Sequence, residues 1–98
     1  MKNELDEILS KIRALLPFLM QKYQVTSIEI FGSYVRNEQE RGSDLDLLVS
    51  FSKVPSLIKF IELKNYLTDQ LQINVDLVMK DALKPQLSQS ILNEAIPI

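Results

Sequence analysis

The alternation of two apolar periods along the chain is the feature that most limits its fold. Short runs rich in β-branched and aromatic residues predict strands, and segments with apolar residues at helical spacing separate them. We expect strands at 25–31, 44–51 and 73–79, and helices at 3–23, 33–38, 57–71 and about 85–94. This α-β-α-β-α-β-α order predicts an α/β (α+β) fold, a small mixed β-sheet flanked by helices.

Three local signals refine this outline. Pro17 lies inside the first helical segment, where it predicts a kink or a break. Ser33, directly after Gly32, is a suitable N-cap for the short helix at 33–38. The tail at 95–98 (AIPI) predicts a short edge strand.

Composition excludes several kinds of chemistry. The 98 residues predict a single domain spanning 1–98, and they include no His and no Cys. Zinc sites of the Cys/His kind, thiol nucleophiles and Ser-His-Asp triads are therefore excluded, and any metal must be held by oxygen ligands, as Mg²⁺, Mn²⁺ and Ca²⁺ are.

Charge and hydropathy argue against two classes of partner, nucleic acids and membranes. The net charge of −2 gives no support for a basic nucleic-acid-binding face, so we expect no direct binding to nucleic acid. The chain has neither the apolar stretch of a signal peptide nor an apolar run of the ~18 residues that a membrane span needs. We therefore expect no membrane association and a cytoplasmic location.

Three aspartates stand out because they interrupt apolar strands. Strand side chains alternate between faces, so Asp44 and Asp46 in DLDLLV point one way while the apolar residues point to the core. Asp76 in NVDLV joins them if the two strands are neighbours. Three clustered carboxylates repel one another, and a divalent cation removes that cost. A lone strand aspartate is as often a solvated surface group, and a D-x-D spacing is common by chance.

A second group of residues precedes this pair. Gly32 and Ser33 follow a predicted strand, where backbone N–H groups can cradle a phosphate and Gly32 allows close approach. The guanidinium of Arg36, three residues beyond Ser33, could pair with a phosphate. Taken singly, Gly32-Ser33 is more commonly a turn with an N-cap, and Arg36 a surface charge.

The combination is more specific than its parts. FGSYVRNEQERGSDLDLLV, followed after a helix by a strand with a lone Asp, resembles the DNA polymerase β-like nucleotidyltransferase superfamily. FGSYVR, SDLDLLV, VDLV and the tail ALKPQLSQSILNEAIPI are similar to the minimal nucleotidyltransferases of prokaryotic HEPN/MNT toxin–antitoxin pairs. The resemblance runs from about residue 25 to the end. It departs at Asn37, where many relatives have Gly, a change expected to affect the local backbone rather than the chemistry.

The resemblance implies roles for the residues that match the motif. Asp44 and Asp46 would be metal ligands, and Asp76 would complete a second metal site and act as general base for the acceptor hydroxyl. Gly32 and Ser33 would hold the triphosphate. The implied cofactor is Mg²⁺, two ions clamping the α-phosphate and the leaving pyrophosphate, and the implied substrate is ATP.

The partner is also implied by the resemblance. In that family a HEPN-domain ribonuclease toxin forms a hetero-oligomer with the antitoxin, which neutralises it by adenylylating a tyrosine. Three hypotheses follow for this chain: a protein adenylyltransferase antitoxin, an antitoxin that masks its toxin by binding alone, and a nucleotidyltransferase acting on a small hydroxyl compound. The three carboxylates speak against a pure binding protein, and the lack of an obvious acceptor module speaks against the third.

Overall fold

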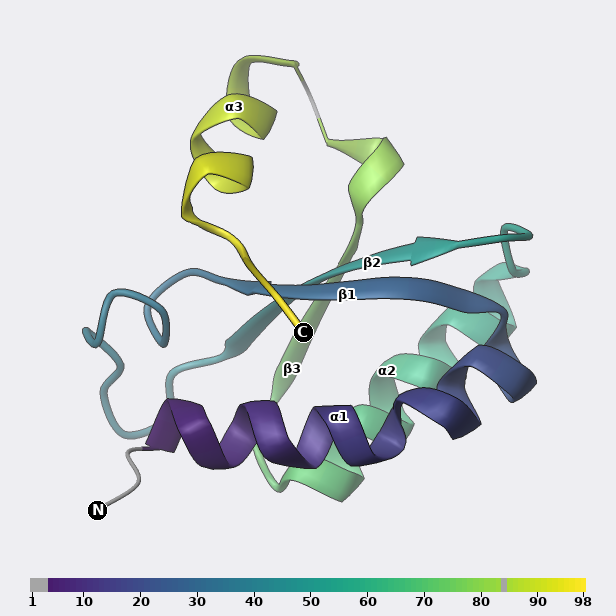
Figure 1. The fold of residues 1–98 in the computed structure, drawn as a ribbon, viewed down its shortest axis with the longest axis horizontal. Helices are drawn as coiled ribbons and strands as arrows, with labels where there is room; N and C mark the ends of the chain where they lie inside the picture. The colour runs from purple at the N-terminus through teal and green to yellow at the C-terminus, as the bar shows by residue number, and fades with distance from the viewer. Residues whose placement is uncertain (1–3, 84) are drawn as a thin grey trace.

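The computed structural model describes residues 4–83 and 85–98 and alternates helices with strands (Figure 1). Its elements are α1 (Glu4–Tyr23), β1 (Val25–Phe31), β2 (Leu45–Phe51), α2 (Leu57–Leu71), β3 (Val75–Met79), the 3₁₀ turn η1 (Lys80–Ala82), α3 (Pro85–Glu94) and β4 (Ile96–Pro97). The first predicted strand, the helix at 57–71 and the edge strand in the tail are confirmed. Asn3, the predicted first residue of α1, lies outside the described residues.

The four strands form one mixed sheet in the order β3-β2-β1-β4. β2 and β3 are parallel, with α2 as the crossover between them, whereas β1 is antiparallel to both β2 and β4. The predicted fold class, a small mixed sheet flanked by helices, is therefore confirmed. β2 begins at Leu45 and β3 at Val75, one and two residues later than the sequence pattern predicted.

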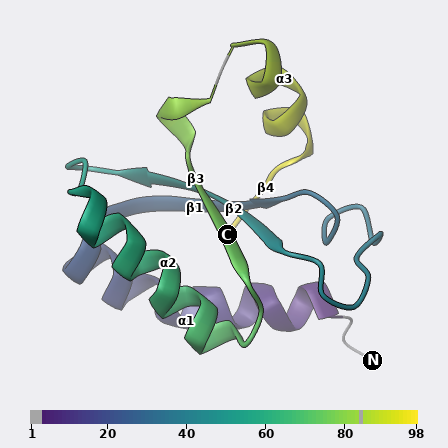
Figure 2. The same cartoon turned by 180° about the vertical axis from the view of Figure 1, so that it is seen from behind.

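Helices α1 and α2 cover one face of the sheet, and α3 lies on the other side (Figures 1 and 2). The core lies between the sheet and the first two helices, because the alternate residues of each strand that point there are apolar. Its fully buried side chains include Ile12, Leu19, Ile28, Ile30, Leu45, Leu47, Leu63, Leu67 and Val75. None of the α3 side chains that the structure describes is buried. The sheet face on the α3 side is thus less covered.

The expected interruption at Pro17 does not break α1, which runs without a gap from Glu4 to Tyr23. A proline inside a helix removes one backbone hydrogen bond and costs roughly 3 kcal/mol. Ile12 and Leu19, buried on either side of it, hold both halves against the sheet. Burial of the apolar stripe therefore outweighs the local cost.

The prediction of a short helix at 33–38 is wrong, because this segment forms consecutive turns. The Gly32 carbonyl accepts hydrogen bonds from the backbone N–H groups of Val35 and Arg36, at 3.1 and 3.3 Å. Asn37 then takes a φ of 59°, in the left-handed region that glycine and asparagine tolerate best. One left-handed residue ends the helical path, and Asn is among the few residues other than Gly that adopt this conformation readily.

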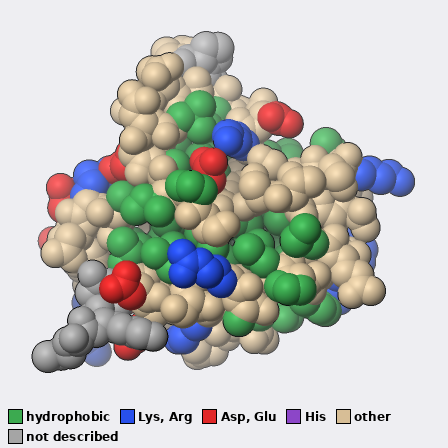
Figure 3. All heavy atoms as spheres, in the orientation of Figure 1, with side chains coloured by type: hydrophobic (Ala, Val, Ile, Leu, Met, Phe, Trp, Pro, Cys, Tyr) green, Lys and Arg blue, Asp and Glu red, His purple; other side chains and the backbone are tan. Residues whose placement is uncertain are grey.

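Two further features concern the hydropathy of the helices and the charges on the surface. No helix within residues 4–83 and 85–98 is long and apolar enough to cross a membrane. On the face shown in Figure 3, acidic and basic side chains lie interspersed among hydrophobic ones.

Candidate active site

Two of the three aspartates are brought together by the parallel pairing of β2 with β3. Asp46 and Asp76 are register partners across these strands. Their neighbours Leu45, Leu47 and Val75 are fully buried toward the helices, so both carboxylates point to the opposite face. The predicted juxtaposition of Asp46 with Asp76 is therefore present.

Asp46 has an unfavourable electrostatic environment. Partial burial, the charge of Asp76, a side-chain hydrogen bond with Asp76 and the charge of Asp44 together raise the pKa of Asp46 to about 6. Arg36 opposes this rise. A partly buried carboxyl beside two other acids is unfavourable when all are ionised, and a divalent cation relieves that repulsion.

Asp44 lies one residue before β2, and Asn74, one residue before β3, contacts it. The side-chain amide of Asn74 donates a hydrogen bond to Asp44 Oδ1 at 2.9 Å, and the backbone N–H of Leu45 donates to the Asn74 carbonyl at 2.8 Å. Asp44 and Asp76 are both exposed, whereas Asp46 is half-buried. Asn74 thus ties the exposed Asp44 to the strand that carries Asp76.

The donor set fits a hard divalent cation, since all three candidate ligands are carboxylates and Asp46 lies within reach of the charges of the other two. Within the part of the chain that the structure describes, no three acidic side chains are already arranged as a cation-binding group. Asp44 accepts a hydrogen bond from Asn74 through Oδ1, and a carboxylate keeps further lone pairs with which it can bind an ion. The chemistry of the residues therefore fits Mg²⁺.

Gly32 packs directly against Asp46. It is buried, its φ is +84°, and a β-carbon built on it would lie 2.0 Å from Asp46 Oδ2. The contact follows from the sheet, because Phe31, the residue before Gly32, is the register partner of Asp46. Ser33 follows in the same turn, half-buried. The Gly-Ser turn thus lies directly against the strand that carries Asp46.

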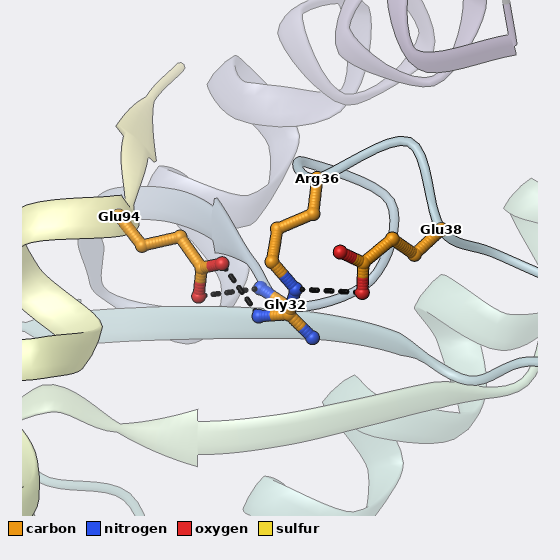
Figure 4. A network of polar contacts seen from close by, with 4 residues as sticks. All are labelled: Gly32, Arg36, Glu38 and Glu94. Atoms are coloured by element: carbon orange, nitrogen blue, oxygen red, sulfur yellow. Dashed lines mark hydrogen bonds and ion pairs between the residues drawn. The ribbon is translucent and has the colours of Figure 1, made fainter.

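Arg36 is fixed between two carboxylates (Figure 4). Its Nη1 atom lies 2.5 Å from Glu94 Oε1, and its Nε lies 3.2 Å from Glu38 Oε2. The other oxygen of Glu94 accepts a hydrogen bond from the backbone N–H of Gly32 at 3.3 Å. The hydrogen bonds from Arg36 to Glu94 and Glu38 raise the pKa of the guanidinium further above its usual range.

Sequence reasoning missed three residues near this face. Glu94 and Asn74 contact site residues, and Lys80, just after β3, pairs with Glu29 of β1 at 3.1 Å. Because β2 lies between β3 and β1, this ion pair crosses over β2. Asn74 could have been found from its place two residues before Asp76. Glu94 could not, since its contacts join residues 62 and 58 positions apart.

A cavity of about 440 Å³ lies beside the site. Its lining includes Asn74, Tyr34, Ser43 and Arg41, but none of the three aspartates. It borders the site through Asn74, the partner of Asp44. The carboxylate face itself is open, as the exposure of Asp44 and Asp76 shows.

The sequence matches the nucleotidyltransferase domain family over residues 12–98. A Methanocaldococcus jannaschii protein assigned to the protein adenylyltransferases is 48% identical over 96% of this chain and 94% of its own length. The protein adenylyltransferase MntA of Thermococcus cleftensis is 46% identical over 94% of this chain and 93% of its own length.

Solved structures agree with this assignment. One described as a minimal nucleotidyltransferase has a TM-score of 0.82 and 34% identity, covering 98% of this chain and 97% of its own. A chain of a toxin–antitoxin complex with AMP-PNP has a TM-score of 0.70 and 26% identity, with 97% and 72% covered. A chain of a complex of tri-AMPylated Shewanella oneidensis HEPN toxin with MNT antitoxin shares the fold, with a TM-score of 0.61, 24% identity, and 95% and 66% covered. The chain therefore belongs to the nucleotidyltransferase domain family, among the minimal nucleotidyltransferases.

Proposed function

We propose that this nucleotidyltransferase is a Mg²⁺-dependent protein adenylyltransferase that acts as an antitoxin, moving AMP from ATP to a tyrosine of a HEPN ribonuclease toxin with which it forms a hetero-oligomer. The observation that carries the proposal is the pairing of Asp46 with Asp76, with Gly32 against Asp46. Relatives at 46–48% identity are named for the same transfer to protein. ATP and Mg²⁺ are supplied in the cytoplasm, which is therefore the compartment where we infer that the protein acts.

The metal ligands in this proposal are Asp44, Asp46 and Asp76. Bound Mg²⁺ would supply neutralisation of phosphate charge. Burial and the neighbouring acids raise the pKa of Asp46, and a cation bound there would relieve both effects. Asn74 holds Asp44 at the edge of this group. An oxygen-only site suits the hard ion and needs no imidazole or thiolate.

The triphosphate contacts in this proposal are Gly32, Ser33 and Arg36. Gly32 has no β-carbon, so the turn that it opens can lie directly against Asp46, one of the proposed metal ligands. The guanidinium of Arg36 is half exposed and so can reach a phosphate oxygen. The turn that carries both residues begins where β1 ends, at the register partner of Asp46, so phosphates bound by this turn would lie at the same end of the sheet as the carboxylates.

The transfer step balances without any further reactant. The tyrosine oxygen attacks the α-phosphorus and forms a new P–O bond, while the bond from the α-phosphorus to the β-bridging oxygen breaks and pyrophosphate leaves. Asp76 takes the hydroxyl proton, because it is exposed and lies next to Asp46. The product is an AMP-tyrosine phosphodiester.

An exposed apolar strip is consistent with a protein partner. Val54, Leu57 and Ile58 are 68%, 73% and 80% exposed, and Ile61 on the same side of α2 is also exposed. Clusters of this kind often mark protein–protein contacts. They support a protein acceptor more than a small hydroxyl compound.

Labelled ATP tests the proposal. With Mg²⁺ and the partner toxin, label on the α-phosphate should become attached to the toxin, and label on the γ-phosphate should not. Asp44→Asn with Asp46→Asn should abolish the labelling. Protection by the double variant equal to that of wild type, with no label on the toxin, would instead establish masking by binding.

A further inference from the structure

Glu94, at the last position of α3, contacts two triphosphate-binding candidates at once. Its Oε2 accepts from the Gly32 backbone N–H at 3.3 Å, and its Oε1 pairs with Arg36 Nη1 at 2.5 Å (Figure 4). Its side chain is only 22% exposed. A single carboxylate thus bridges the Gly32 backbone N–H and the Arg36 guanidinium.

The position of Glu94 is set by the pairing of β4 with β1. Ile96 is the antiparallel partner of Ile30, and Pro97 that of Glu29. Continuing this register by two residues brings Glu94 opposite Gly32. Ile96 and Ile98 pack against the core, whereas the described side chains of α3 are not buried. The pairing of β4 with β1 therefore places Glu94 beside the turn, and this placement does not need the α3 side chains to be buried.

The contact fixes both ends of the turn. The Gly32 carbonyl already accepts from Val35 and Arg36 N–H groups, so Glu94 satisfies the remaining backbone group of Gly32. Gly32 in turn packs on Asp46. Arg36 uses Nη1 for Glu94 and Nε for Glu38, and its side chain is 48% exposed. A guanidinium has five N–H donors, so Arg36 can bind a phosphate oxygen while it keeps both contacts.

We propose that Glu94 is a positioning residue for nucleotide binding: it holds the Gly32 backbone against Asp46 and aims Arg36 at the triphosphate. The inference rests on the proposed function, because it assigns the triphosphate to this turn. It predicts that removing the carboxylate weakens ATP binding. A carboxylate that merely occupied the phosphate site would have the opposite effect, since its removal would free the N–H and the guanidinium and relieve a like-charge repulsion.

Glu38 provides a matched control. It is the second carboxylate on Arg36, but it is exposed, and the carboxylate that accepts from the Gly32 N–H is that of Glu94. Glu38→Gln removes one charge from Arg36 and leaves the backbone contact intact. Glu94→Gln removes the charge but keeps an oxygen that can accept from Gly32 N–H, and Glu94→Ala removes both contacts.

The test measures ATP binding to the full chain with Mg²⁺, together with the melting temperature of each variant, before any acceptor is added. We expect Glu94→Ala to raise the Kd for ATP by about tenfold, Glu94→Gln to raise it less, and Glu38→Gln to leave it within about twofold. The KM for ATP in labelled transfer should follow the same order, with kcat changed less. Amide hydrogen exchange at Gly32 should accelerate in Glu94→Ala and stay near wild type in Glu94→Gln.

Each other result counts against the inference. Unchanged or tighter ATP binding by both Glu94 variants overturns it, as does an equal loss in Glu38→Gln. Should Glu94→Ala melt well below wild type, the comparison of Glu94→Gln with Glu38→Gln decides. Wild-type protein that binds ATP but never labels the toxin contradicts the proposed function alone, whereas wild-type protein that binds no ATP contradicts both.

Discussion

The carboxylate of Asp46 lies so close to Gly32 that a β-carbon at position 32 would stand 2.0 Å from Asp46 Oδ2. Gly32 also has a φ of +84°, which side chains rarely adopt. The glycine and the aspartate therefore depend on each other. The turn can meet the strand only without a side chain, and Asp46 is placed only while the turn is there.

Gly32→Ala should thus lower stability by roughly 2–4 kcal/mol, from the left-handed backbone and the forced displacement of Asp46, and should abolish nucleotidyl transfer. Gly42→Ala is the matched control, because Gly42 has a φ of +91° but a β-carbon added there would meet no atom within 4 Å. Gly42→Ala should lower stability only by the cost of a left-handed backbone, about 1–2 kcal/mol, and leave activity near wild type. Chemical denaturation and labelled transfer measure both. Equal losses in the two variants would contradict the close contact at Gly32.

The pH dependence of stability should reveal the unfavourable environment of the ionised Asp46 carboxylate. Its pKa is about 6 in the folded protein against an ordinary value of 3.8. As pH rises from about 4 to 6, the unfolded chain releases this proton first, so the free energy of unfolding falls across that window and stays lower above it.

Asp46→Asn removes this penalty. Without metal at pH 7 it should be more stable than wild type by on the order of 1–2 kcal/mol, after allowance for solvent screening, and the difference should vanish below about pH 4. Urea denaturation in EDTA at several pH values measures it. A variant less stable than wild type at pH 7 would show that Asp46 is not under repulsion.

The faces of the strands could be predicted from the sequence, and the contacts between distant turns could not. Alternation in DLDLLV determined that Asp46 points away from Leu45 and Leu47, and the buried side chains agree. The pairing of Asp46 with Asp76 needed only the further condition that β2 and β3 be neighbours.

The 33–38 segment shows where local patterns fail. A serine after a glycine predicted an N-cap, yet the left-handed φ of Asn37 makes the segment a series of turns. Glu94 was missed for another reason. Its place beside Gly32 follows from a two-residue strand, Ile96–Pro97, whose register no periodicity reveals.

Asn74 should matter for catalysis but little for folding. Its side chain donates to Asp44 Oδ1 at 2.9 Å, and the backbone bond from Leu45 to the Asn74 carbonyl does not depend on the side chain. Asn74→Ala should therefore reduce transfer by about tenfold, the loss expected for a hydrogen bond to a charged group, with a stability change under about 1 kcal/mol. Titration with Mg²⁺ should show weaker metal binding. Normal activity at limiting Mg²⁺ would rule out a role in holding Asp44.

Mg²⁺ should stabilise the wild-type protein by ligand linkage. At 100 times its Kd the ion would add about 2.7 kcal/mol to the free energy of unfolding. Asp44→Asn with Asp46→Asn should abolish the increase, because two of the three proposed ligands lose their charge. Thermal melts with Mg²⁺ or EDTA measure the difference. Equal stabilisation of wild type and double variant would place the ion elsewhere.

Turnover on the partner toxin tests the central claim most directly. Covalent modification is catalytic, whereas masking consumes one antitoxin for each toxin. A substoichiometric amount of this protein, incubated with ATP, Mg²⁺ and excess toxin, should add adenylyl groups to most of the toxin, as intact-protein mass spectrometry would detect, and ribonuclease activity should fall in parallel. Ribonuclease inhibition that stops at one toxin per antitoxin, with the toxin's mass unchanged and the Asp44→Asn, Asp46→Asn variant equally protective, would contradict the account.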